Sequence, residues 1–323
     1  MAQANIRKLA EQWGAAGVAE MDSLTKASGI LQVAEAIPAS HDMYHKHKKL
    51  DALPTFSVTD AAGSLGDVTT NNNIYQTDLK YIKAHESEPA DIVDHWNGGP
   101  PAYFNDQRPA FLESFGQTAS KTIIYGNNAT FGDVGGMIGW HQMAKAYGNE
   151  IDAGGDSGST TTIFAVKFRQ GSNGCGILYD SKVNGPGQFM TSDVKNGGKS
   201  ILETTNTTGR LKQEVYQVVH KGILGFLSTS SYDVARIHSI QYATDDTPTA
   251  DEMQQLIDMV RGESGNTFLF MNRLGRRSIN KLKNDDLIAN ISDKEYNTII
   301  ETYNGIRIVL DENILSTETS ALD

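Results

Sequence analysis

A Gly-Asp-Ser-Gly tetrapeptide at residues 155–158 is a stretch of this sequence whose residue types and spacing could do chemistry. The same four residues surround the nucleophile of trypsin-like serine proteases, so Ser157 is a candidate nucleophile. A hydrolase also needs a histidine base and a carboxylate that orients it, because an unactivated hydroxyl is a poor nucleophile near neutral pH. None of the eight histidines lies in an Ala-Ala-His-Cys context. We therefore interpret the tetrapeptide as a glycine-rich turn before a buried strand, and keep a serine hydrolase using Ser157 as a remote alternative.

A second motif, Gly198-Lys199-Ser200, matches the end of a phosphate-binding loop. The glycine that such a loop needs five residues earlier is replaced by Asp193. This puts a carboxylate where phosphates require backbone N–H donors. A solvated turn is the better interpretation, and we predict no cofactor.

Histidines near residue 45 raise the question of a zinc site. His41 and His45 are four residues apart and would share one face of a helix, with His47 nearby. The residues between them do not include the glutamate of an HExxH zinc site. We therefore predict a cationic, solvated segment with helix-like spacing and no metal. Its lysines, Lys46, Lys48 and Lys49, are candidates for contact with nucleic acid phosphates.

Composition narrows the class of protein. The 323 residues carry 28 basic and 39 acidic side chains, a formal net charge of -11. That balance works against a broad nucleic-acid-binding surface, although it allows weak, non-specific contact through a local basic patch. The single cysteine, Cys175, cannot form an intrachain disulfide, which suits a reducing compartment. No apolar run is long enough for a membrane helix, and the N-terminus lacks the apolar region of a signal peptide, so we expect no membrane association.

The first part of the chain is predicted to protrude from the body. Residues 1–52 form an N-terminal arm in which helical spacing over residues 3–37 predicts short helices. Residues 53–88 contain two strand-like runs, 55–58 and 74–84, around a tip rich in Gly and Asn, which predicts a long hairpin. Neither piece can enclose a core of its own, so its apolar side chains must be covered by other copies of the chain. The candidate assembly contacts are Trp13, Tyr75, Leu79 and Tyr81.

The remaining sequence predicts a mixed α+β protein. Within residues 89–150 the spacing becomes helical from about 109 to 125, and Gly126 stands where the helix should end. Residues 151–245 are rich in β-branched and aromatic runs separated by turns. Residues 246–323 alternate helix, strand, helix and strand.

This order of elements resembles the major capsid (coat) proteins of tailed bacteriophages, which share the Hong Kong 97 (HK97-like) fold. Most of the chain takes part in the resemblance. The stretches that carry it are LDALPTFSVTDAAG with NIYQTDLKYIKAHES, DIVDHWNGGPPAYFNDQRPAFLESFGQTASKTIIYGN, DAGGDSGSTTTIFAVKFRQGSNGCGILYD, ADEMQQLIDMVRGESGNTFLFMNRLGRRSINKLK and YNGIRIVLDENIL. They are similar to the extended hairpin (E-loop), the spine helix of the peripheral (P) domain, the β-rich P/A segments and the axial (A) domain.

The resemblance implies a structural protein, not an enzyme, that assembles into hexamers and pentamers. These would form the icosahedral head around the double-stranded DNA of a tailed phage, in a virion assembled in the host bacterial cytoplasm. An encapsulin-like nanocompartment shell is the alternative within the same fold. Because the hairpin begins by about residue 55, we expect a separate scaffolding protein in place of an N-terminal scaffolding segment. A portal and a decoration protein are further implied partners.

Overall fold

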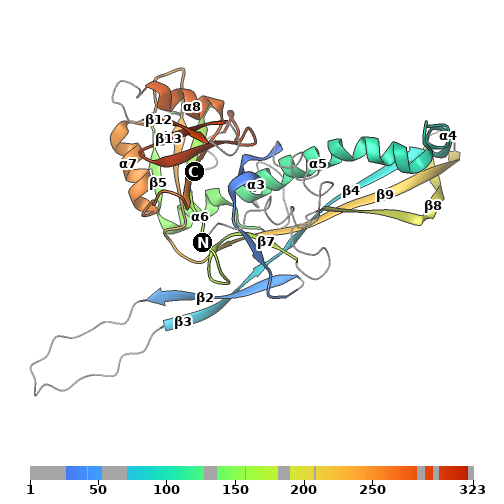
Figure 1. The fold of residues 1–323 in the computed structure, drawn as a ribbon, viewed down its shortest axis with the longest axis horizontal. Helices are drawn as coiled ribbons and strands as arrows, with labels where there is room; N and C mark the ends of the chain where they lie inside the picture. Colours follow the sequence, from blue (N-terminus) through green and yellow to red (C-terminus); the bar gives the residue numbers. More distant parts are fainter. Residues whose placement is uncertain are drawn as a thin grey trace, which may run out of the picture.

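A computed structural model gives the fold of the protein (Figure 1). It describes residues 27–41, 43–52, 71–126, 137–156, 158–180, 190–206, 209–281, 288–293 and 298–318. Two of the residues singled out in the sequence, Trp13 and Ser157, lie outside these ranges. A globular lobe stands at one end, a long extension of helix and sheet runs away from it, and a strand pair projects separately (Figure 1). Within the described ranges, every helix is too short or too polar to span a lipid bilayer.

The globular lobe is built on a seven-stranded sheet with the order β12-β13-β14-β11-β6-β10-β5. Its central strands β6, β10 and β11 are almost entirely buried. The sequences of β6 and β11 are largely apolar, whereas β10 also buries Arg236 and His238. The strands are β5 (Glu150–Asp152), β6 (Thr161–Lys167), β10 (Val234–Ile240), β11 (Thr267–Met271), β12 (Ile288–Asp293), β13 (Thr298–Tyr303) and β14 (Ile306–Leu310).

Three helices pack around this sheet. Helix α6 (Trp140–Tyr147) lies against β10. Helix α7 (Ala250–Met259) begins at a capping box in which Thr249 and Glu252 satisfy each other's backbone N–H groups. Helix α8 (Arg273–Asn280) follows β11, and its N-cap Asn272 accepts from the N–H of Gly275. The predicted alternation of helix, strand, helix and strand in this part of the chain is confirmed, with β12 and β13 as additional strands.

The extension consists of a long helix lying over a sheet (Figure 1). The sheet has the order β1-β7-β9-β4, and β8 pairs with β9 toward the far end. Strand β9 is 20 residues long and joins the far end to the lobe. The strands are β1 (Ala36–Pro38), β4 (Lys80–Pro89), β7 (Cys175–Tyr179), β8 (Met190–Asn206) and β9 (Gly209–Ser228).

Helix α5 (Gly99–Tyr125) is the predicted spine helix, but it begins ten residues earlier than the expected residue 109. Its 27 residues span about 40 Å at about 1.5 Å per residue. Prolines in its first turn are compatible with a helix because those N–H groups have no intrahelical acceptor. The predicted end at Gly126 is confirmed: this residue has φ 58°, and a Cβ there would lie 2.2 Å from the backbone nitrogen of Gly139.

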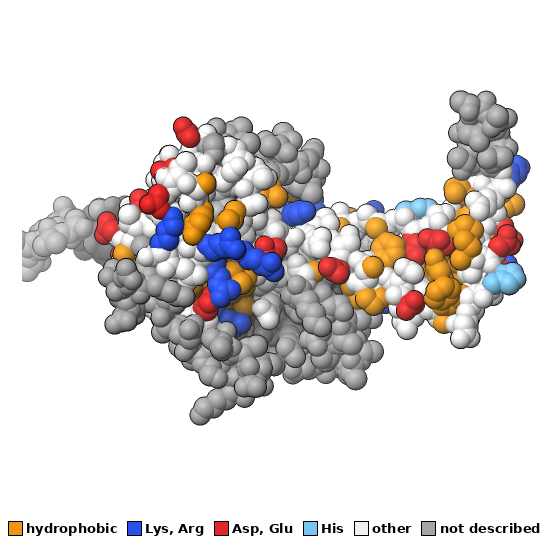
Figure 2. Space-filling model, turned by 90° about the horizontal axis from the view of Figure 1, so that it is seen from above, with side chains coloured by type: hydrophobic (Ala, Val, Ile, Leu, Met, Phe, Trp, Pro, Cys, Tyr) orange, Lys and Arg blue, Asp and Glu red, His pale blue; other side chains and the backbone are white. Residues whose placement is uncertain are grey.

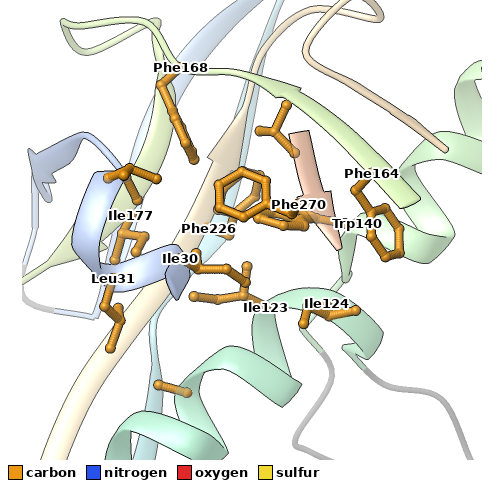
Figure 3. Packing of buried hydrophobic residues seen from close by; sticks show 14 of the residues in the cluster. Ile30, Leu31, Ile123, Ile124, Trp140, Phe164, Phe168, Ile177, Phe226 and Phe270 are labelled. Atoms are coloured by element: carbon orange, nitrogen blue, oxygen red, sulfur yellow. The ribbon is translucent and has the colours of Figure 1, made fainter. Parts of the chain in front are cut away.

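One apolar core joins the lobe to the extension (Figure 3). Trp140 lies at its centre, with the rings of Phe164, Phe226 and Phe270 around it. Helix α3 (Gly29–Val33) inserts Ile30 and Leu31 into the same core. The stretch from Ser28 to Pro38, expected within a protruding arm, is therefore part of the subunit's body.

Candidate interaction surfaces

The projecting strand pair consists of β2 (Tyr44–Ala52) and β3 (Asn71–Asp78), which run antiparallel with His47 opposite Tyr75. The expected helix-like segment around His41 and His45 is thus wrong, because Tyr44–Ala52 is a strand. Over residues 45–48 its side chains alternate with period two, with His45 and His47 buried and Lys46 and Lys48 exposed, which is the pattern of a strand. The predicted first strand at residues 55–58 lies outside the described residues.

The histidines of β2 face the body of the subunit. His45 is buried, its Nε2 lies 2.7 Å from the carbonyl oxygen of Ser172, and its Nδ1 accepts from the N–H of Ser40. Among the described residues, no group of three His, Cys, Asp or Glu side chains is placed to hold a metal ion. His45 therefore anchors the strand pair to the turn between β6 and β7.

Two lysines of β2 face outward. Lys46 and Lys48 are exposed, and the Lys46 ammonium lies 5.6 Å from the ring centroid of Tyr44. The backbone N–H of Lys48 donates to Oδ1 of Asn173 at 3.2 Å. The side chain of Lys49 lies outside the described part of the chain.

The three aromatic and aliphatic candidates at residues 75–81 do not share one exposed face. Tyr75 is 40% exposed and stacks on His47, and Tyr81 is 43% exposed beneath the Lys83 ammonium. Leu79 is only 2% exposed, so its expected exposure is wrong. The chain passes at Leu79 from β3, which pairs with β2, to β4, which pairs with β9. Leu79 fills the small core that forms at this crossing.

The far end of the extension carries exposed apolar side chains that the sequence analysis did not single out. Ile92 and Trp96 lie at or just after helix α4 (Ala90–Asp94), and Ile201 on β8 is 68% exposed. The space-filling view shows apolar side chains gathered toward this end (Figure 2). Strand β8 has a mostly polar sequence, so hydrophobic periodicity gives no sign of this surface. Exposed apolar groups gathered in this way are typical of a surface that another protein covers.

A polar network holds this end in shape. The Asp94 carboxylate accepts from Lys199 Nζ at 2.5 Å and from the Tyr216 hydroxyl at 2.8 Å. These bonds join α4, β8 and β9. The hydrogen bond from Lys199 lowers the pKa of Asp94, so the carboxylate stays ionised.

A second polar network connects the lobe to the extension through hydrogen bonds. The Tyr125 hydroxyl donates to Oε1 of Glu318 at 2.6 Å, and the Thr162 hydroxyl donates to Oε2 of the same side chain at 2.5 Å. Burial, together with the neighbouring Glu318 carboxylate, raises the pKa of Tyr125 well above its usual value. The described C-terminal residues are thereby fixed to the end of α5.

Cys175 is fully buried in β7, and burial raises the pKa of its thiol well above the usual value. A buried thiol of this kind is unreactive.

Comparisons with known proteins agree with this architecture. The family described as Major capsid protein GP7 matches residues 14–321 of the chain. The chain is similar to a structure from bacteriophage Epsilon15, with 16% identity, 89% of this chain and 87% of that chain covered, and a TM-score of 0.61. It is also similar to the bacteriophage JBD30 capsid, at 12% identity, 88% and 89% coverage and a TM-score of 0.43. The SrpI encapsulin complex from Synechococcus elongatus PCC 7942 gives 9% identity, 64% and 85% coverage and a TM-score of 0.44. A search of curated proteins found no significant match.

Proposed function

The chain belongs to the family of major capsid protein GP7, and from that premise we propose how its surfaces build the shell. It is a structural protein with the HK97-like fold that assembles with copies of itself into a phage capsid. Its place is therefore in the virion. The family match favours this role over the encapsulin-like alternative.

We propose that the β2–β3 pair and the far end of the extension are the contacts between neighbouring copies. Tyr75 and Tyr81 present exposed rings on or beside the projecting pair, and Ile92, Trp96 and Ile201 do so at the far end. Burying such side chains stabilises association by about 25 cal/mol per Å² of apolar area. Trp13, on the segment before the described residues, is a further proposed contact. Leu79 is not, because it is covered within its own subunit.

The observation that carries this assignment of contacts is the separation of the projecting pair from the body. Beyond its anchor at Ser172 and Asn173, the pair extends away from both lobe and extension (Figure 1). A two-stranded ribbon is at best marginally stable in water by itself. Contact with another copy would supply the missing burial, and closed rotational symmetry would give hexamers and pentamers.

Tyr81→Asp tests the proposed contact. We expect folded, soluble subunits that no longer form shells, because a carboxylate replaces an exposed ring that would be buried between copies. Tyr81→Phe is the matched control and should assemble normally. Circular dichroism checks the fold, and negative-stain electron microscopy checks for shells. Normal shells from Tyr81→Asp would show that this side chain lies outside the contact.

Further partners belong to the same proposal. The shell would enclose double-stranded DNA, with weak, non-specific contacts through exposed cations such as Lys46 and Lys48. A separate scaffolding protein, a portal and a decoration protein would complete a head assembled in the host bacterial cytoplasm.

The role is structural and requires no catalysis, which leaves a hydrolase using Ser157 without support from the family. Nucleic acid recovered from purified particles would support a phage head, whereas enclosed protein cargo would indicate a compartment.

A further inference from the structure

Helix α8 presents a cationic face on the globular lobe. Its exposed or half-exposed cations, together with the lysine that follows the helix, stand at positions i, i+3, i+4 and i+8 and therefore share one face. The opposite face is buried through Gly275, Ser278 and Ile279. Figure 2 shows Lys and Arg side chains gathered over the lobe. The four cations are Arg273, Arg276, Arg277 and Lys281.

Three of these cations have carboxylate partners on other elements. Arg273 Nε lies 2.9 Å from Oε1 of Glu312, and both side chains are largely exposed. Arg276 pairs with Glu301, and Lys281 pairs with the exposed Asp245. Exposed ion pairs stabilise a protein by only about 0–1 kcal/mol and are screened by salt. A competing polyanion can therefore exchange for Glu312 and Asp245 at little cost, whereas the pair of Arg276 with Glu301 is half-buried.

Arg277 differs from the other three. Its side chain is exposed and forms no ion pair with any residue that the structure describes. The sequence of α8, RLGRRSIN, contains no acidic residue. Among the described residues, no carboxylate therefore competes with a ligand for the charge of Arg277.

We propose that the α8 face (Arg273, Arg276, Arg277 and Lys281) binds the phosphate backbone of double-stranded DNA. This inference rests on the proposed function, in which the shell encloses DNA. Residues 273 to 281 cover about 12 Å at about 1.5 Å per residue. A DNA strand carries one phosphate per about 3.4 Å of helix axis, so this length matches about three to four phosphates. Guanidinium groups also bind phosphate in a bidentate manner.

The chemistry of the face favours a polyanion over a protein partner. Protein interfaces of ordinary size have an apolar core. Helix α8 offers no exposed apolar residue for one, because Ile279 is buried and Leu274 is half-buried. The face therefore suits a ligand that is recognised by charge.

The salt dependence of binding provides the test. Each phosphate contact contributes about 0.9 to the slope of log K against log salt concentration. Full-length, unassembled subunits would be titrated into a fluorescent 30-base-pair duplex at several salt concentrations, with sedimentation confirming that they remain unassembled. We expect Arg277→Gln to lower the slope by about 0.9, and the Arg273→Gln/Arg277→Gln pair to lower it by about 1.8. Arg277→Lys keeps the charge and should keep the slope.

Lys145→Gln is the matched control, because Lys145 is an exposed cation in the last turn of α6 and lies outside the α8 face. It should leave the slope unchanged. An unchanged slope for Arg277→Gln would overturn the proposal. Arg277→Gln subunits that keep the wild-type slope but fail to form shells would also overturn it, and would assign the face to contact with a second copy. Shell formation by the wild-type protein, followed separately by electron microscopy, reports on the proposed function and not on the α8 face.

Discussion

The Ser120 hydroxyl donates a hydrogen bond of 3.1 Å to Oδ2 of Asp311, although 191 residues separate the two in sequence. The same oxygen accepts from the backbone N–H of Ile30 at 3.1 Å. Oδ1 of Asp311 accepts from the backbone and the side chain of Asn313. One buried carboxylate therefore joins α5, the end of β14 and the segment that enters the body at α3. Helix α5 belongs to the extension, β14 belongs to the lobe, and α3 packs into the core between them.

Asp311→Ala should lower the free energy of unfolding by about 2–4 kcal/mol. The substitution leaves the backbone N–H groups of Ile30 and Asn313 buried without their acceptor, and each unsatisfied group costs about 1–3 kcal/mol. Urea titration of unassembled subunits, followed by circular dichroism, measures the change. Asp156→Ala is the control, because Asp156 is exposed, and should change stability by less than about 0.5 kcal/mol. Equal midpoints for the two variants would contradict the structural role of Asp311.

Leu79 and Tyr81 are only two residues apart, yet truncating each side chain should change the stability of the subunit by a different amount. Leu79→Ala removes a side chain that packs against Ile223 and Leu227, and should lower the free energy of unfolding by about 2–4 kcal/mol. Tyr81→Ala removes a ring that is 43% exposed in the single subunit, and should cost less than about 1 kcal/mol there. Urea denaturation of both variants gives the comparison. A stability loss of similar size in both would place Tyr81 in the subunit core and remove it from the proposed contact.

The sequence predicted helices and strands well where a signal in the neighbouring residues determines where they form or end. Gly126 ended a helical pattern and ends α5, because its positive φ and its close approach to Gly139 both exclude a side chain. Residues 246–323 were predicted to begin with helix, strand and helix, and α7, β11 and α8 follow that order; the structure shows that a capping box of Thr249 and Glu252 starts α7. Residues 151–245 were predicted to be rich in β structure because of their β-branched and aromatic runs, and β6 and β10 lie there.

The sequence failed where pairing between distant segments decided the outcome. Tyr44–Ala52 has a polar composition, and its strand conformation depends on its pairing with β3 and on the contact of His45 with Ser172. Leu79 lies in one continuous strand-like run, and nothing local shows that the run changes partner there. The exposed Ile201 belongs to a polar strand that is paired only with β9. Propensity is a weak guide at such positions because tertiary contacts override it.

The environment of His141 predicts how stability depends on pH. His141 lies on α6 and is buried, and its Nε2 accepts from the guanidinium of Arg236 on β10, which also pairs with Glu150 at 2.7 Å. Burial and the nearby Arg236 charge lower the pKa of His141 to about 3, against about 6.5 for an unperturbed histidine. Between these values the unfolded chain binds the proton and the folded chain does not. Stability contributed by neutral His141 is therefore fully present above pH 6.5 and is lost as the pH falls toward 3.

His141→Gln tests whether His141 causes a loss of stability as the pH falls, because glutamine offers Arg236 an acceptor that does not titrate. Between pH 8 and pH 5 the wild-type subunit should lose about 2 kcal/mol more stability than the variant, from a slope of about 1.4 kcal/mol per pH unit below pH 6.5. Urea denaturation at pH 8, 7, 6 and 5 measures both curves, and their difference cancels the titration of groups common to both proteins. The variant is expected to be less stable than wild type at pH 8 and to approach it as the pH falls. Parallel curves over this interval would mean that His141 takes up its proton in the folded subunit, and that the Arg236 contact does not exclude it.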